Sequence, residues 1–234
     1  SERGVGVVLG GIRDFDGERT MRCGAMSVIP ERRGTEVAGL LMDRHRQEAL
    51  DQGCGQLFLE VIAANGRARR FYEKCGYTVR HELRYFVHAD PAALARETGE
   101  EGASALAVGE LSFAELRRYR EALEGLHVNW QNEMDYIERA GGVHYGIRED
   151  GGRLAAALSM KGGSVKFLHV DESQRRRGYA RRLLAHGVAR ALSDNPDLKA
   201  IRSSFPADAG LKAFYERLDF AEDALYQHEM VSAL

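Results

Sequence analysis

The stretch that decides the fold prediction is LHVDESQRRRGYARRLLA, residues 168–185. An apolar strand is predicted to end at Val170 and a helix to begin near Gly178, so the arginine-rich loop leads into a helix N-terminus. Such an end presents unpaired backbone N–H groups and the positive pole of the helix dipole, which together bind phosphate. Glycine lets the backbone approach an anion, and Ala180 is also small. Phosphate binding is favoured over the alternative, a solvated basic helix start.

The same pattern occurs earlier in the chain, in MSVIPERRGTEVAGLLMD at residues 26–43. Glu36 aligns with Gly178 at an offset of 142 (178 − 36). A second pair of stretches, RRFYEKCGY and KAFYERLDF, aligns Tyr72 with Tyr215 at an offset of 143 (215 − 72). Two unrelated patterns that recur in one order at nearly one spacing indicate a duplicated domain.

Strands and helices alternate through both halves, and glycine-containing turns at residues 16–17 and 150–152 mark hairpins. This order predicts an α/β architecture with mixed sheets. The first half has only a hairpin before its loop, whereas the second half has further helices there, so the first half looks truncated at its front and degenerate. The stretch DPAALARETGEEGAS predicts a linker with at most one weak helical turn. The predicted division is an N-terminal domain at 1–90, a linker at 91–102 and a C-terminal domain at 103–234.

Composition excludes several classes of protein. The 234 residues carry a formal net charge of −2, which gives no bulk attraction to nucleic acid. The three cysteines, Cys23, Cys54 and Cys75, form no C-x-x-C pair and no cluster with histidine, so free thiols in a reducing cytosol are expected. No apolar run approaches the roughly 20 residues that span a bilayer, and the start of the chain predicts a strand and not a signal peptide. We therefore expect a cytoplasmic protein without metal, nucleic-acid or membrane partners, and leave a homodimer open.

Two motifs together resemble one family. The pattern R-x-x-G-x-A at Arg175, Gly178 and Ala180, after FLHV, resembles the acetyl-CoA pyrophosphate motif of the GNAT acetyltransferase superfamily. The stretch AFYERLDF resembles that family's second motif, and NGRARRFYEKCGY in the first half is a better version of it. The resemblance covers nearly the whole chain as a tandem pair. It implies two GNAT-like domains, each a mixed, mostly antiparallel sheet flanked by helices.

The resemblance also implies a reaction in the second half. Acetyl-CoA would be the co-substrate, with its pantetheine arm between two splayed strands, and the primary amine of a small molecule or peptide would attack the thioester directly. Such a reaction needs a base for the amine, a backbone N–H on the carbonyl and a proton for the thiolate. Tyr215 is the candidate proton donor because a tyrosine with a pKa near 10 stays neutral. The residues implied to bind the co-substrate are Leu168, His169, Val170, Arg175, Arg176, Arg177, Gly178, Tyr179, Ala180 and Arg181.

The base is less well defined by the sequence. His169 and Glu229 are candidates only by their strand positions. A single histidine on a strand is more often a packing residue, and that alternative stays open. The stretch at residues 123–142 is expected to shape the acceptor pocket, where its acidic and aromatic residues would suit a polar or cationic amine; solvated helix faces are the other interpretation.

The first half departs from the motif at Glu36, which stands where glycine is expected. Two unit charges 4 Å apart at an effective dielectric of about 20 interact by roughly 4 kcal/mol, so the carboxylate would repel a diphosphate. A helix N-terminus contributes only about 0.3–1 kcal/mol per favourable charge. We therefore expect the first half to bind acetyl-CoA poorly or not at all.

Other functions compete with this interpretation. A CoA-binding pseudoenzyme or sensor would keep Gly178 and the arginines without turnover. A tandem layout with one degenerate half also resembles mycothiol synthase, which implies a related acyltransferase. A nucleic-acid binder is disfavoured because the arginines lie in one turn without an aromatic platform. A dinucleotide fold is disfavoured because GVGVVLGG, residues 4–11, lacks the G-x-G-x-x-G spacing.

Overall fold

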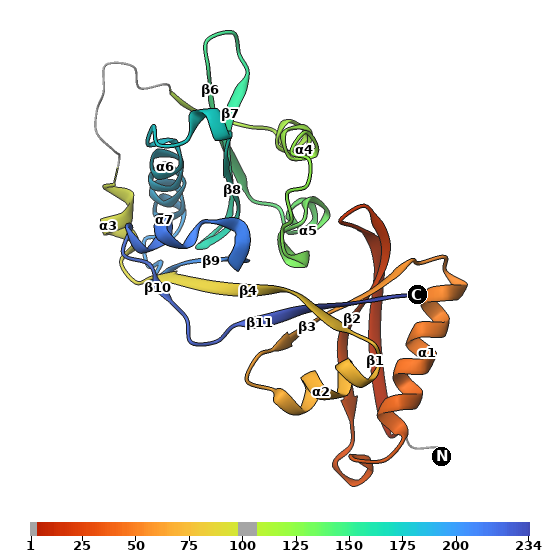
Figure 1. Cartoon of the computed structure of the whole chain (residues 1–234). Helices are drawn as coiled ribbons and strands as arrows, with labels where there is room; N and C mark the ends of the chain where they lie inside the picture. Colours follow the sequence, from red (N-terminus) through yellow and green to blue (C-terminus); the bar gives the residue numbers. More distant parts are fainter. Residues whose placement is uncertain (1–3, 98–106) are drawn as a thin grey trace. The chain divides into compact units, whose positions relative to one another are not determined.

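The computed structural model describes residues 4–97 and 107–234, and the chain divides into two compact units (Figure 1). The first unit comprises Ser1–Leu83 and Ala224–Leu234, and the second comprises Arg84–Asp223. The later part of the predicted linker, residues 98–102, lies outside the described residues. Its earlier part forms a short helix, α3 (Pro91–Ala95), which Asp90 caps by accepting a hydrogen bond from the amide of Ala93.

The first unit is a sheet with two helices packed on one face. Its strands follow the order β1, β2, β3, β11, β4, in which only the β2–β3 pair is parallel. Side chains from α1 and α2 join those of the strands in one apolar core. The elements are β1 (Gly6–Phe15), β2 (Glu18–Val28), the 3-10 helix η1 (Pro30–Arg32), α1 (Val37–Asp51), β3 (Gln56–Ile62), α2 (Gly66–Lys74), β4 (Thr78–His88) and β11 (Gln227–Ala233).

The last strand of the chain, β11, lies between β3 and β4 in this first sheet (Figure 1). Met230 in β11 is fully buried and belongs to the core of the first unit. This differs from the predicted C-terminal domain at residues 103–234, which includes this strand. Alternation of apolar and polar residues identifies a strand but not its partners, because pairing depends on contacts far apart in sequence.

The second unit has helices on both faces of its sheet: α6 and α7 on one face, α4 and α5 on the other (Figure 1). From Arg84 onward β4 belongs to this unit, in the strand order β4, β9, β8, β7, β6, β5. Both sheets are mixed and mostly antiparallel, which confirms the predicted fold class. The remaining elements are β5 (Val108–Glu110), α4 (Phe113–Glu121), η2 (Trp130–Asn132), α5 (Met134–Ala140), β6 (Val143–Arg148), β7 (Leu154–Lys161), β8 (Ser164–Val170), η3 (Glu172–Gln174), α6 (Tyr179–Asp194), β9 (Ile201–Pro206), η4 (Ala207–Ala209), α7 (Lys212–Glu216) and β10 (Ala221–Glu222).

Local sequence explains why the helices of the second unit begin and end where they do. Ser112 and Glu115 form a reciprocal capping box at the start of α4. Gly141, with φ of 67°, ends α5. Apolar residues on α6, among them Leu183 and Leu184, are fully buried in the core, so the helix is held by its packing on the sheet.

The duplicated strand–loop–helix segments have matching local structure. The loops contain η1 and η3, which start at positions 142 apart (172 − 30). In the first unit, Arg33 Nε donates to the carbonyl oxygen of Val28 at 3.1 Å. In the second, Arg175 Nε donates to the carbonyl oxygen of Val170 at 3.3 Å, again at an offset of 142 (175 − 33). One arginine in each loop therefore stabilises the end of the preceding strand.

Replacing Met230 by alanine should loosen the first unit alone, because its buried side chain contributes to that core. A buried Met→Ala change costs about 2–5 kcal/mol. Hydrogen–deuterium exchange should then speed up in β3 and stay slow in β6 and β7. Leu158→Ala, in the core of the second unit, is the matched control and should give the reverse pattern. Equal acceleration in both units for either variant would contradict the assignment of β11.

Candidate active site

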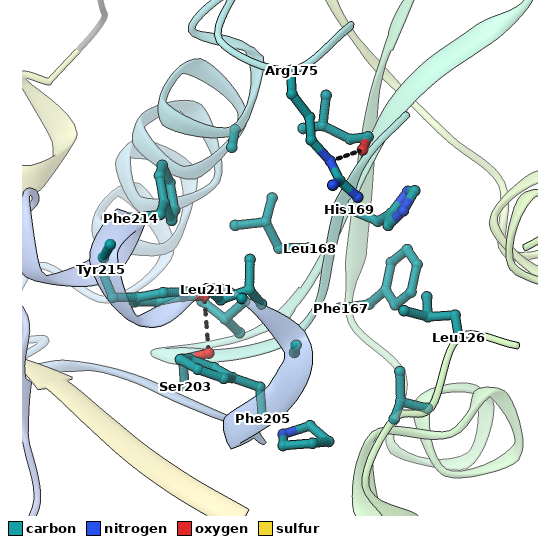
Figure 2. Close-up of a pocket in the computed structure, with 18 of the residues that line it drawn as sticks. Leu126, Phe167, Leu168, His169, Arg175, Ser203, Phe205, Leu211, Phe214 and Tyr215 are labelled. Carbon is teal, nitrogen blue, oxygen red and sulfur yellow. Dashed lines mark hydrogen bonds between the residues drawn. The ribbon is translucent and has the colours of Figure 1, made fainter. Parts of the chain in front are cut away.

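A cavity of about 810 Å³ opens in the second unit, and Figure 2 shows many of the side chains that line it. Its wall comes from β8, the loop into α6, β9, α7 and the segment after α4. Arg177, which was predicted to bind the co-substrate, belongs to the same loop but is not among the lining residues. The predicted residues that do line the cavity are Leu168, His169, Val170, Arg175, Arg176, Gly178, Tyr179, Ala180, Arg181 and Tyr215.

The cavity exists because β8 and β9 separate. Their parallel pairing consists of two residue pairs, Ser164 with Arg202 and Val165 with Ser203. Beyond these pairs, β8 continues to Val170 along the cavity wall without pairing to β9. The backbone edge of β8 on this side is therefore open to a ligand, and buried backbone groups need a hydrogen-bonding partner.

Successive side chains of β8 face opposite sides of the sheet. Leu168 points toward the α7 side chains, whereas Phe167 and His169 lie on the other side of the strand, toward Leu126 (Figure 2). The cavity therefore has one wall of apolar residues from α7 and another that carries a histidine.

The start of α6 lines the cavity at the far end of β8. Gly178 precedes the helix with φ of 78°, in the left-handed region that glycine adopts without strain. A Cβ atom there would meet nothing within 4 Å, so the glycine is required by its backbone conformation and not by a close neighbour. The first helical hydrogen bond runs from the amide of Arg182 to the carbonyl of Gly178 at 3.0 Å. The amides of residues 179–181 come before it and have no acceptor within the helix.

The arginines of this loop have structural contacts of their own. Arg175 holds the carbonyl of Val170 and forms an ion pair with Glu172 at 3.3 Å. Arg181 forms an ion pair with Glu97 at 3.5 Å. Both pairs are exposed, where such contacts contribute about 0–1 kcal/mol, so an anion could replace them at little cost.

The loop of the first unit differs from the loop before α6 at Glu36, the position where the sequence predicted a difference. Glu36 precedes α1 with φ of −68° and ψ of −13°, a right-handed conformation, where Gly178 is left-handed. Two residues earlier both loops keep a left-handed residue, Gly34 with φ of 83° and Arg176 with φ of 67°. The two loops therefore diverge in backbone as well as in charge where a phosphate would approach.

Tyr215 is 1% exposed, and its ring packs among Phe205, Phe214 and Phe220. Its hydroxyl oxygen accepts a hydrogen bond of 2.9 Å from Ser203 Oγ (Figure 2). Ser203 is the last residue of β9 that pairs with β8, so the phenol lies where these two strands begin to separate. Burial raises the pKa of Tyr215 to about 12, which keeps the phenol protonated at neutral pH.

His169 has partners that the sequence did not reveal. Its Nδ1 lies 2.9 Å from the hydroxyl of Tyr119 on α4. The same hydroxyl lies 2.7 Å from Asp171 Oδ1, and Arg153 donates to Asp171 Oδ2 at 2.7 Å. Burial lowers the pKa of His169, so its ring is neutral at pH 7. No sequence pattern links these side chains, because Tyr119 lies 50 residues away from His169 along the chain.

Gln174 lines the cavity, and its Oε1 is buried without a hydrogen-bond partner among the described residues. A buried acceptor of this kind indicates a donor supplied by a ligand or by water. Glu229, the other candidate base, lies on β11 in the first unit opposite Glu60 and His81, and it is not among the residues that line the cavity.

Comparison with known families identifies the class of protein that this fold and site define. The Acetyltransferase (GNAT) family matches residues 2–77, and an Acetyltransferase (GNAT) domain matches residues 112–230, about half of the chain. The chain therefore belongs to the GNAT acetyltransferase superfamily and carries two such domains in tandem, as the two motifs predicted. Members of this superfamily transfer acyl groups.

Solved structures share this fold over nearly the whole chain. A tandem GNAT protein from the clavulanic acid biosynthesis pathway matches with a TM-score of 0.72 and 18% identity, covering 98% of this chain and 79% of that one. A GCN5-related N-acetyltransferase from Kribbella flavida matches with a TM-score of 0.65 and 16% identity, covering 98% of this chain and 88% of that one. Another from Sphaerobacter thermophilus matches with a TM-score of 0.64 and 14% identity, covering 97% of this chain and 76% of that one. At these identities the likeness concerns the fold alone. Among curated proteins, none is significantly similar to this chain.

In residues 4–97 and 107–234, no group of three or more histidine, cysteine, aspartate and glutamate side chains is arranged to hold a metal ion. Within the same ranges, no helix combines the length and the apolar character that crossing a membrane requires.

Replacing Gly178 by alanine should destabilise the second unit by about 1–2 kcal/mol, the cost of a left-handed conformation for a residue with a Cβ atom. Because the space around Gly178 is open, the effect should come from the backbone alone. Urea unfolding measures it. Gly39→Ala is the control: Gly39 lies inside α1 with open space around it, and alanine there should stabilise by about 0.5–1 kcal/mol. Effects of the same sign would contradict the backbone explanation.

Proposed function

We propose that this chain is an acetyl-CoA-dependent N-acetyltransferase whose second unit transfers an acetyl group to the primary amine of a small molecule or peptide. One observation carries the proposal: the open edge of β8 leads directly to the unbonded amides at the start of α6, within one cavity. The enzyme acts in the cytoplasm, needs no metal, and is compatible with a homodimer.

The cavity fits an extended ligand that ends in a diphosphate. The amides of residues 179–181 and the dipole of α6 suit the diphosphate, and Arg176 lies beside them in the lining. The edge of β8 suits a chain with amide groups, such as pantetheine, and Gln174 Oε1 suits an N–H donor. Acetyl-CoA, when bound, supplies an activated thioester.

The residues of the cavity account for each proton in the proposed reaction. His169, neutral at pH 7, takes the proton that the amine loses as its nitrogen bonds to the acetyl carbon. A backbone N–H from the region of Leu168 polarises the carbonyl. As the carbon–sulfur bond breaks, Tyr215 gives its proton to the sulfur. Because Ser203 donates to the oxygen of Tyr215, the proton of the phenol is not used in that contact.

The proposal is tested by CoA release in a screen of polyamines, amino acids, aminoglycosides and peptide N-termini. For an active amine, Tyr215→Phe should lower kcat by about 10²-fold, the usual contribution of a positioned acid, and leave the dissociation constant for acetyl-CoA unchanged. Tyr145→Phe is the control, since Tyr145 is also buried in the second unit and does not line the cavity. Tight acetyl-CoA binding without turnover of any amine would favour the sensor, and transfer to a mycothiol precursor would favour the mycothiol-synthase-like alternative.

Calorimetric titration with acetyl-CoA should give one site per chain, because Glu36 excludes the diphosphate from the first unit. Gly178→Glu places the same carboxylate in the second loop and should abolish binding. Glu36→Gly is the paired control and should leave the affinity of the single site unchanged. Two equal sites in the unmodified chain would rule out the expectation for the first unit.

A further inference from the structure

Hydrogen bonds link three polar side chains, those of His169, Tyr119 and Asp171, and of these His169 lines the cavity. Tyr119 lies on α4, His169 on β8 and Asp171 directly after β8. The hydroxyl of Tyr119 lies 2.9 Å from His169 Nδ1 and 2.7 Å from Asp171 Oδ1. Both distances are those of good hydrogen bonds, and a third group, the carbonyl oxygen of Ala155, lies farther from the same hydroxyl, at 3.4 Å.

The chemistry of the groups fixes the direction of both hydrogen bonds. Asp171 accepts from Arg153 through its second oxygen at 2.7 Å, as an ionised carboxylate does. An ionised carboxylate can only accept, and so can the carbonyl of Ala155, so the single proton of the Tyr119 hydroxyl points to the nearer of the two, Asp171. The oxygen of Tyr119 then has only lone pairs to offer His169. Nδ1 must therefore carry the proton of the neutral imidazole, and the lone pair of the ring lies at Nε2.

We propose that Tyr119 and Asp171 are positioning residues that hold His169 in the Nδ1–H tautomer, so that Nε2 is free to take the proton of the attacking amine. The inference rests on the proposed acetyl transfer, and it assigns to two residues outside the sequence motifs a part in that reaction.

The packing around His169 fixes the plane of its ring as well as its tautomer. The ring stacks on Phe167, with centroids 6.3 Å apart and an angle of 28°, and it meets the ring of Tyr119 at 5.7 Å and 58°. Among the described residues, none forms a hydrogen bond with Nε2. His169 lines the cavity, so the free nitrogen belongs to a side chain that a ligand can reach.

The step balances without a proton reaching Asp171. Nε2 gains the amine proton and Nδ1 keeps its own, which yields an imidazolium that still donates to Tyr119. The Tyr119 proton stays on its oxygen, and Asp171 stays ionised. The carboxylate stabilises the imidazolium through the intervening hydroxyl, in the way that an aspartate orients a catalytic histidine.

Charged groups from several elements act on His169. Burial lowers its pKa, and so do Arg175 in the loop and Arg120 on α4. Asp171 and Glu172 raise it. Without the negative charge of Asp171, the pKa of His169 should therefore be lower still. The acidic limb of the pH–rate profile, which follows the pKa of the base, should then move to lower pH.

The experiment is Tyr119→Phe in the full chain, with an amine that the unmodified protein acetylates. The variant keeps the ring and loses the hydroxyl. We expect kcat/KM to fall about tenfold, as for loss of a group that orients a functional histidine, and the acidic limb of the pH–rate profile to move to lower pH. Asp171→Asn should move the limb in the same direction. Tyr145→Phe should change neither the rate nor the profile.

Nitrogen-15 NMR of the histidine rings provides a readout that does not depend on turnover. The signal of His169, assigned by its loss in His169→Gln, should show a protonated Nδ1 and an unprotonated Nε2 at neutral pH, and Tyr119→Phe should lose this fixed pattern. A protonated Nε2 in the unmodified protein would overturn the inference. So would turnover in Tyr119→Phe with an unchanged rate and profile. Failure of the unmodified protein to acetylate any amine would instead count against the proposed function.

Discussion

The early end of the pairing between β8 and β9 is the constraint on which the candidate site depends. Two parallel residue pairs hold the strands together, and the rest of β8 faces a cavity. The other parts of the site are arranged around the gap between these two strands. Ser203 and Tyr215 lie at its apex, and the start of α6 lies at its open end. A sheet usually satisfies its backbone groups internally, so a gap of this kind is stable only where a ligand or water completes the hydrogen bonds.

The phosphate-type loop was predictable because its physics is local. A strand, a glycine and a run of arginines before an apolar helix predict a helix N-terminus near Gly178, and α6 begins directly after this residue. Residues joined across the sheet could not be predicted in this way. The contact between Tyr119 and His169 spans 50 positions, and the partner of Tyr215 is a serine on a different strand. Such contacts follow from strand register, which residue periodicity alone does not determine.

The two duplicated loops distinguish two roles of the motif, one in the structure of the loop and one, as proposed, in the binding of phosphate. Arg33 and Arg175 make the same contact with the preceding strand, although only the second loop has glycine at the helix start. The shared arginine is therefore explained by loop structure in both units, whereas Gly178 distinguishes them. An arginine in this motif is weaker support for phosphate binding than the glycine that follows it.

The position of β11 has a consequence for synthesis of the protein. During translation, the ribosome releases β1, β2 and β3 long before the strand that pairs with β3 has been made. The residues of the second unit, Arg84–Asp223, all emerge before that strand. The second unit can therefore complete its fold first, while the first sheet keeps an unpaired strand edge until β11 has been made. An exposed edge of this kind favours association with other chains, which makes the interval a period of risk for aggregation.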